Sequence, residues 1–225
     1  MKKFFVLLSF VITSQTSVFS QLEIGGEIAP SFSNMNIGGD YNLINNVSYI
    51  TGAKTGITLK YYSPLGLGVE TGLQYHLTGF KVKQGLDFEV YNLPVSAGVT
   101  AIPRFHFLEV PALLSYRTGG NKIHGIFSAG PYVAFAVDGE IKTRANFLID
   151  FNLGTYDLNL NNNIFNRWEI GLMAKAGFEI PIQDFKLSFF GSFQHGLNDL
   201  SDEPILDIRT RRYALGLGTG LTYVF

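Results

Sequence analysis

Apolar and polar residues alternate along most of this chain, and the clearest case is the stretch 213–225, with Leu, Thr and aromatic residues at every second position. The positions between them hold Ala, Gly, Thr and Val. A period of two predicts a β-strand, because successive side chains of a strand point to opposite faces. A tilted strand needs about 9–11 residues to cross a bilayer. Large apolar groups on one face and small groups on the other therefore predict a strand between lipid and a crowded lumen.

Six other segments alternate in the same way, and a seventh, at about 122–137, is mostly apolar on both faces; all seven are long enough to cross a bilayer. Tight turns, rich in Gly, Pro, Asn or Asp, separate some of these segments, and longer polar connections separate the others. The predicted strands lie at about 22–32, 51–62, 67–80, 104–117, 122–137, 167–182 and 185–197, with turns at 63–66, 119–121 and 183–184 and long connections at 33–50, 81–103, 138–166 and 198–212.

Short and long connections thus alternate along the chain, which is typical of bacterial outer-membrane barrels with short periplasmic turns and long external loops. We therefore predict an all-β fold, an eight-stranded antiparallel up-and-down transmembrane β-barrel. Within 138–166, the alternation at Phe147–Phe151 and Leu158–Leu160 is too short to span, so we expect a hairpin above the membrane. A soluble β-sandwich would also alternate, but glycines and charges of both signs on the polar face favour a tight lumen.

The inward face of the predicted strands carries six acidic and six basic residues. An eight-stranded barrel has room only for side chains or one small ligand, and unpaired buried charges are costly. We expect a salt-bridged plug; a gated ion path and a ligand cavity are the alternatives. The predicted lumen charge network consists of Glu23, Glu27, Lys54, Lys60, Glu70, Glu109, Arg117, Arg167, Glu169, Lys175, Glu179 and Lys186.

The first twenty residues are expected to be a secretory signal peptide, followed by one barrel domain at 21–225. Lys2 and Lys3 precede a short apolar run that is far below the about 20 residues of a membrane helix. The chain has 17 Lys and Arg against 18 Asp and Glu, and removal of the signal would leave a net charge of about −3, which does not favour nucleic-acid binding. Absence of cysteine excludes disulfides and thiolate metal sites.

No catalytic, cofactor or metal site is predicted. Lipid A deacylases carry a His-x-Ser-Asn stretch, but Leu197 stands at the serine position after His195, and acyl transfer needs a nucleophile there. Ser192 would lie on the opposite face of the strand from His195. The histidines show no metal-ligand spacing, and the acidic residues of 199–207 lack the order and the glycine of a calcium loop.

The strand around Pro111 is similar to one known family. Proline lacks the amide donor of a strand ladder and usually marks an edge or a bulge, so Pro111 is unexpected inside a predicted strand. The stretch 107–117, Phe-Leu-Glu-Val-Pro followed by Leu-Ser-Tyr-Arg, nevertheless resembles a strand of the PorT-like outer-membrane barrels of the Bacteroidetes, and this resemblance accounts for the proline. Gly130–Tyr132, Gly177–Glu179 and Gly196–Asp199 fit the same family. The resemblance implies an eight-stranded barrel in the outer membrane; the founding member takes part in type IX secretion, and the family offers no catalytic residues.

These observations lead to a functional expectation. The preferred hypothesis is a non-enzymatic outer-membrane barrel with a structural, adhesive or partner-binding role through its external loops, where binding usually sits. The expected partners are outer-membrane lipid, the barrel-assembly machinery and an envelope or extracellular protein. The terminal aromatic residues Tyr223 and Phe225 would be the signal that the assembly machinery recognises. The stretch 147–163 is the candidate contact with a protein partner. The alternatives are a small gated channel, a secretion component and a lipid-modifying enzyme.

Overall fold

The computed structural model describes residues 21–38, 47–90, 93–120, 122–147, 149–158, 160, 166–199 and 209–225. The signal peptide predicted at 1–20 lies outside these residues. None of the described residues forms a helix long and apolar enough to cross a membrane.

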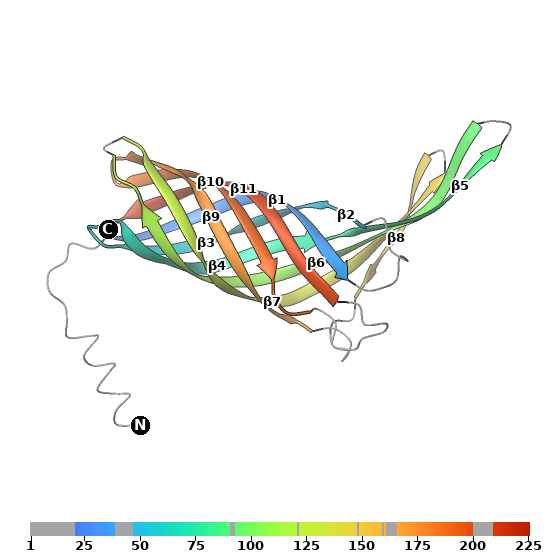
Figure 1. Cartoon of the computed structure of the whole chain (residues 1–225), viewed down its shortest axis with the longest axis horizontal. Helices are drawn as coiled ribbons and strands as arrows, with labels where there is room; N and C mark the ends of the chain where they lie inside the picture. The colour runs from blue at the N-terminus through green and yellow to red at the C-terminus, as the bar shows by residue number, and fades with distance from the viewer. Residues whose placement is uncertain are drawn as a thin grey trace, which may run out of the picture.

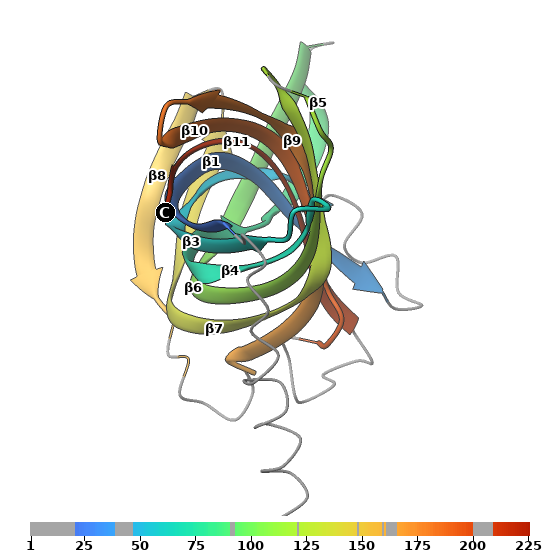
Figure 2. The same cartoon turned by 90° about the vertical axis from the view of Figure 1, so that its left-hand side faces the viewer.

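Eight long strands form a closed antiparallel barrel, which confirms the predicted fold class (Figures 1 and 2). Closure is made by the pairing of β6 with both β4 and β7, and of β1 with both β3 and β11. No edge of the barrel then faces lipid, where an unpaired backbone group would find no hydrogen bond. The strands are β1 (Gln21–Gly38), β3 (Ile50–Tyr62), β4 (Leu67–Gly79), β6 (Leu93–Arg117), β7 (His124–Phe147), β9 (Trp168–Ile182), β10 (Phe185–Gly196) and β11 (Arg209–Val224).

The two faces of the strands follow the predicted alternation. Along β3, buried and exposed residues alternate almost without interruption. Most exposed positions are apolar, as at Leu114 and Leu217, which are 75% and 67% exposed, while the charged Glu109 and Glu169 are fully buried. Apolar groups outside and polar groups inside are what a lipid-embedded barrel requires.

Aromatic side chains gather at both ends of the apolar band, where membrane barrels carry their girdles. Phe135 and Trp168 pack near the end with long connections, with ring centroids 4.8 Å apart. Near the end with short turns, Tyr223 packs against both Phe185 and Phe225. The Phe225 amide donates to the carbonyl of Leu22 (3.0 Å), so the last residue is fixed at the seam between β11 and β1.

Pro111 lies in a barrel strand that is paired on both sides. The β4–β6 ladder runs to the pair Thr71–Ala112 and starts again at Gln74–Glu109, so the missing donor of Pro111 falls in a gap of the ladder. The Thr71 hydroxyl donates to the Pro111 carbonyl (2.8 Å) and links the strands there.

The structure corrects the predictions for two of the long connections. The connection predicted at 81–103 contains two paired strands: β5 (Lys81–Val90) pairs with the first part of β6, from Val82 with Ala101 to Val90 with Leu93. The signal for β5 was present in the sequence, because apolar residues alternate with charged residues and glycine over most of 81–90. A hairpin does lie in 138–166, but its arms differ from the expected pair 147–151 and 158–160. Strand β7 continues to Phe147 and pairs with β8 (Ile149–Asp157), while Leu158 and Leu160 lie outside the strand.

Strands β5, β6, β7 and β8 thus form a four-stranded sheet that projects from the barrel end opposite the C-terminus (Figure 1). A short strand, β2 (Val47–Ser48), pairs with Val82 and Lys81 at the base of β5. Strands β6 and β7 are 25 and 24 residues long, well beyond the length that crosses a bilayer, and each runs through both the barrel and the sheet. We call this projection the extracellular sheet.

Replacement of the lipid-facing Leu217 by Arg should lower the free energy of unfolding by about 2–4 kcal/mol, because a cation near the bilayer midplane is poorly solvated. Urea titration of vesicle-embedded protein, followed by the fluorescence of Trp168, measures the change. Leu65→Arg in a short turn, where Leu65 is 81% exposed, is the control and should change stability by less than about 0.5 kcal/mol. Equal effects of the two substitutions would contradict the lipid-facing assignment.

Candidate functional site: the lumen charge network

The barrel lumen holds six carboxylates and six cationic side chains within the described part of the chain. Eleven of the twelve predicted residues are present, and Arg212 takes the place of Arg167. All six carboxylates are buried, and the cationic side chains are at most about one-tenth exposed. The network consists of Glu23, Glu27, Glu70, Glu109, Glu169 and Glu179 with Lys54, Lys60, Arg117, Lys175, Lys186 and Arg212.

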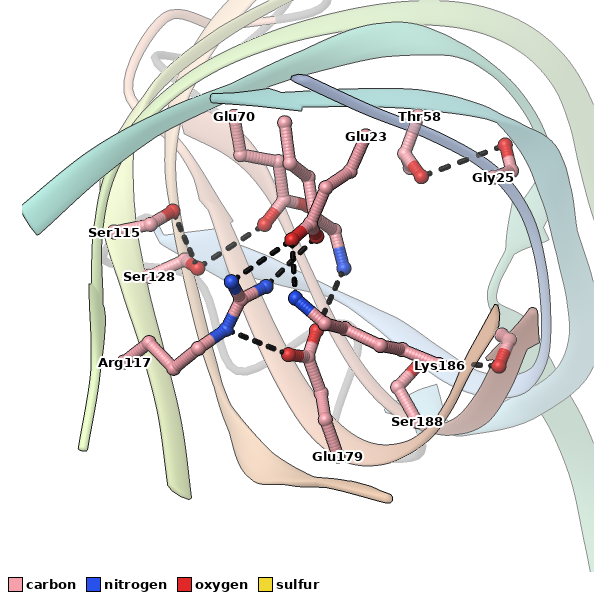
Figure 3. Close-up of polar contacts among 12 residues, drawn as sticks. Glu23, Gly25, Thr58, Glu70, Ser115, Arg117, Ser128, Glu179, Lys186 and Ser188 are labelled. Carbon is pink, nitrogen blue, oxygen red and sulfur yellow. Dashed lines mark hydrogen bonds and ion pairs between the residues drawn. The ribbon is translucent and has the colours of Figure 1, made fainter. Parts of the chain in front are cut away.

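The first layer lies near the short turns and is centred on Arg117 (Figure 3). Both terminal nitrogens of Arg117 donate to the two oxygens of Glu23, at 2.8 and 2.7 Å, and its Nε donates to Glu179 at 2.9 Å. Lys186 Nζ adds a second bond to Glu23 at 2.5 Å. The guanidinium also lies 3.6 Å from the ring centroid of Tyr62. A bidentate pair of this kind fixes both charges and their orientation.

The second layer is centred on Lys175 and lies further along the lumen. Lys175 Nζ contacts both oxygens of Glu27, at 2.9 and 2.7 Å, and one oxygen of Glu70 at 2.6 Å. The Ser128 hydroxyl donates to the other Glu70 oxygen at 3.1 Å. Lys60 joins the first two layers, because its Nζ lies 3.4 Å from Glu27 and 3.5 Å from Glu179.

The third layer is centred on Arg212 and lies toward the extracellular end. Arg212 donates to Glu169 from Nε and Nη2, and its Nη2 also donates to Glu109 at 2.9 Å. The side chains of Gln194 and Tyr132 donate to Glu109 and Glu169, at 2.8 and 2.6 Å. Further contacts to Glu109 come from Lys54 Nζ at 3.4 Å and His76 Nδ1 at 2.9 Å.

An apolar cap covers the third layer. Phe107 is fully buried and lies under the Arg212 guanidinium, with its ring centroid 4.5 Å from Cζ. Leu160, from the connection after β8, packs into the same cluster, and the backbone amide of Leu158 donates to Gly139 O at 2.8 Å. The cap includes Met35, Phe105, Phe107, Ala134, Ala136 and Leu160, with Phe80 and Leu158 packed against it.

Charge pairing explains how twelve buried ions coexist in so narrow a barrel. Removing a carboxylate or an ammonium from water costs several kcal/mol, which close pairing and additional hydrogen bonds must offset. Each layer supplies at least two contacts to its central cation. Three paired layers below an apolar cap favour the salt-bridged plug over an open ion path.

Arg167 was assigned to the lumen, and this assignment is wrong. Its Nε donates to the carbonyl of Ala136 at 3.0 Å, and its guanidinium lies 4.5 Å from the ring centroid of Phe135, a partly exposed residue. Arg167 precedes the first residue of β9, Trp168, so the alternation of that strand does not extend to it.

The sequence interpretation missed Arg212, which was placed in a loop. The signal was present, because Arg212 has the same parity as Ala214 and lies within β11. His76 and Gln194 have the same parity as the predicted lumen residues Glu70 and Lys186 of their strands, so the alternation places them on the inward face, but neither carries a fixed charge. No pattern marked Tyr132, because its strand is apolar on both faces.

A known family matches this chain over residues 13–202, and its description is outer membrane protein beta-barrel domain. The chain belongs to this family. The protein is therefore an integral outer-membrane β-barrel, as its lipid-facing surface requires. No curated protein matches the sequence.

Several solved outer-membrane barrels are similar to this one. Neisserial surface protein A is 12% identical, with a TM-score of 0.43 and coverage of 91% of this chain and 97% of that chain. Ail, the attachment invasion locus protein of Yersinia pestis, is 16% identical, with a TM-score of 0.38 and coverage of 89% and 98%. OprG from Pseudomonas aeruginosa is 15% identical, with a TM-score of 0.38 and coverage of 91% and 95%.

Replacement of Arg212 by Met should lower the free energy of unfolding by about 3–5 kcal/mol, because Glu109 and Glu169 would lose the cation between them. Arg167→Met removes the same charge at the rim and is the matched control, expected to cost less than about 1 kcal/mol. Urea titration in vesicles measures both. A larger loss for Arg167→Met than for Arg212→Met would contradict the assignment of Arg212 to the network.

The plug predicts that the purified protein produces no conductance steps in a planar bilayer, because ions would have to separate three layers of paired charges. Glu70→Gln, which alters the second layer, should also stay silent. Conductance steps in the unmodified protein that change in size with Glu70→Gln would instead establish an ion path along the lumen.

Proposed function

We propose that this protein is a plugged, non-enzymatic anchor that presents its extracellular sheet to a protein partner outside the cell. The observation that supports the proposal is the continuity of β6 and β7 from the barrel into the sheet. A sheet built on uninterrupted barrel strands is held in a fixed orientation, and binding surfaces commonly sit on such scaffolds.

Exposed apolar side chains on the extracellular sheet support the same proposal. Val99 on β6 is 48% exposed, and Leu153 and Tyr156 on β8 are 54% and 63% exposed. These residues lie beyond the girdle of Phe135 and Trp168, outside the band where lipid explains apolar exposure. Leu153 and Tyr156 fall within the stretch 147–163 that the sequence suggested as a contact surface.

One arrangement in the lumen resembles the order of a hydrolase triad and is the strongest argument for an enzyme. Ser31 Oγ lies 3.1 Å from His76 Nε2, and Glu109 lies 2.9 Å from His76 Nδ1. However, all three side chains are buried beneath the cap, at 2% exposure or less. Arg212 Nη1 also lies 3.2 Å from His76 Nδ1, where its charge opposes the imidazolium that a general base must form. A structural role agrees better with these surroundings.

Three finer assignments stay predictions. Membership of the PorT-like group rests on the Phe107–Pro111 stretch, and a part in secretion would follow only from that resemblance. The paired layers in the lumen speak against a channel. Tyr223 and Phe225 are 40% and 68% exposed at the end of β11, which suits contact with the assembly machinery.

A photo-crosslinking amino acid placed at Leu153 or Tyr156 should form protein adducts on intact cells of the native host. The same group at Leu217 is the control and should react with lipid, because Leu217 lies in the membrane band. Mass spectrometry identifies the adducts. Absence of protein adducts from both sheet positions, in protein that still folds, would overturn the proposal.

A further inference from the structure

A groove crosses the lipid-facing surface of the barrel. Its volume is about 930 Å³, and it extends over neighbouring strands from Leu67 on β4 to Phe32 on β1, by way of β6, β7, β9, β10 and β11. A second hollow of about 590 Å³ meets the groove at Gly191 and Leu217. Between large apolar neighbours, small outward residues leave room down to the backbone. These small residues are Ala129, Ala174, Ala176 and Gly191.

Gly191 lies where the two hollows meet, and the packing of this chain does not require a glycine there. A Cβ on Gly191 would lie 3.8 Å from Leu217 Cδ2 and 3.9 Å from the nearest backbone oxygens, which is ordinary contact. In contrast, a Cβ on the lumen-facing Gly177 would lie 2.1 Å from Phe189 O. Glycine weakens a strand, and one explanation of its presence is the close approach of a ligand. The space above Gly191 is therefore available to a molecule outside the chain.

The groove rises from the periplasmic interface to the middle of the membrane. The strands run obliquely to the barrel axis (Figure 1), and Leu67 is the first residue of β4 after a short turn, whereas Gly191 is the seventh residue of β10 after another. This difference of six residues, on strands tilted by about 40°, corresponds to a rise of roughly 15 Å. The hydrocarbon core is about 30 Å thick, so the rise equals the depth of one leaflet.

A flexible acyl chain fits this groove better than a second barrel does. The groove winds obliquely over the convex surface of several strands, and a second barrel, which is also convex and rigid, cannot follow such a path. An acyl chain can bend along it. The polar end of the lipid would lie at the periplasmic interface, beside Tyr116 at the start of the groove. Lys122, exposed in the turn after β6, offers a charge complementary to a lipid phosphate.

We propose that the groove binds an acyl chain of a phospholipid from the periplasmic leaflet, with the phosphate near Tyr116 and Lys122 and the chain end beside Gly191. Other lipids around the barrel are just as apolar, so the hydrophobic effect does not favour this one. Close van der Waals contact along a fitted groove does. The bound lipid then exchanges more slowly than the rest of the lipid that surrounds the barrel.

Gly191→Leu tests the proposal, because the new side chain fills the groove and its Cβ has space. The purified protein is placed in phosphatidylethanolamine vesicles that contain a minor fraction of the same lipid with a photoreactive acyl chain. Crosslinks in the unmodified protein should concentrate in the groove, and native mass spectrometry after transfer to detergent should show one retained phospholipid. Gly191→Leu should reduce both signals about fivefold, because the displaced chain loses its contacts.

Gly26→Leu is the matched control. Gly26 also faces lipid, and a Cβ on it would meet only Gly56 O, at 3.9 Å, but Gly26 does not line either hollow. This variant should retain the phospholipid as the unmodified protein does, and a heat-dependent gel shift verifies that both variants are folded.

Three results overturn the inference: no phospholipid retained by the unmodified protein, equal retention by Gly191→Leu, or crosslinks spread evenly around the barrel. A dimer of the unmodified protein that Gly191→Leu abolishes also overturns it, since a second copy would then occupy the groove. None of these results bears on the contact proposed for the extracellular sheet.

Discussion

The structure depends on one constraint: hydrocarbon cannot accept or donate hydrogen bonds, so every backbone group in the membrane must be paired within the protein. Strands can meet that condition only by closing on themselves, and the pairings β6–β7 and β1–β11 close this barrel. Closure with eight strands also makes the lumen narrow. The small diameter then restricts the contents of the lumen, because side chains fill so narrow a space and unpaired buried charges are costly.

The charge layers are the consequence of that narrow lumen. Arg117, Lys175 and Arg212 each lie between two carboxylates, and each layer draws its residues from strands far apart in the sequence. Such pairs do not by themselves guarantee a large stabilisation, since desolvation offsets much of their attraction. They do tie distant strands together across the lumen. Small residues make room for this packing: a Cβ on Gly218 would lie 2.5 Å from the ring of Phe190, which lies against Lys175.

A filled lumen moves the search for function to the part of the molecule outside the membrane. Two barrel strands continue into the extracellular sheet, so its position follows from the barrel itself rather than from a flexible linker. The sheet carries exposed apolar groups, among them Leu153 and Tyr156 on β8. Exposed apolar groups outside the membrane band favour association with another molecule. The barrel then serves as the anchor, and the sheet carries the contact.

The sequence by itself determined the class of fold, the number of membrane strands and eleven of the twelve lumen charges. It could do so because lipid on one side and a lumen on the other force a period of two on every spanning strand. It did not yield β5, although residues 81–90 alternate as well, because a period of two marks any strand with two different faces and does not say whether that strand belongs to the barrel. The sequence assigned Arg167 to the lumen and Arg212 to a loop, whereas the structure shows the reverse. Both residues lie near strand ends, where alternation does not show which residue still belongs to the ladder. Only the tertiary structure decided which charges pair, since Arg212 meets Glu109 and Glu169 across the lumen from strands that are not its neighbours in sequence.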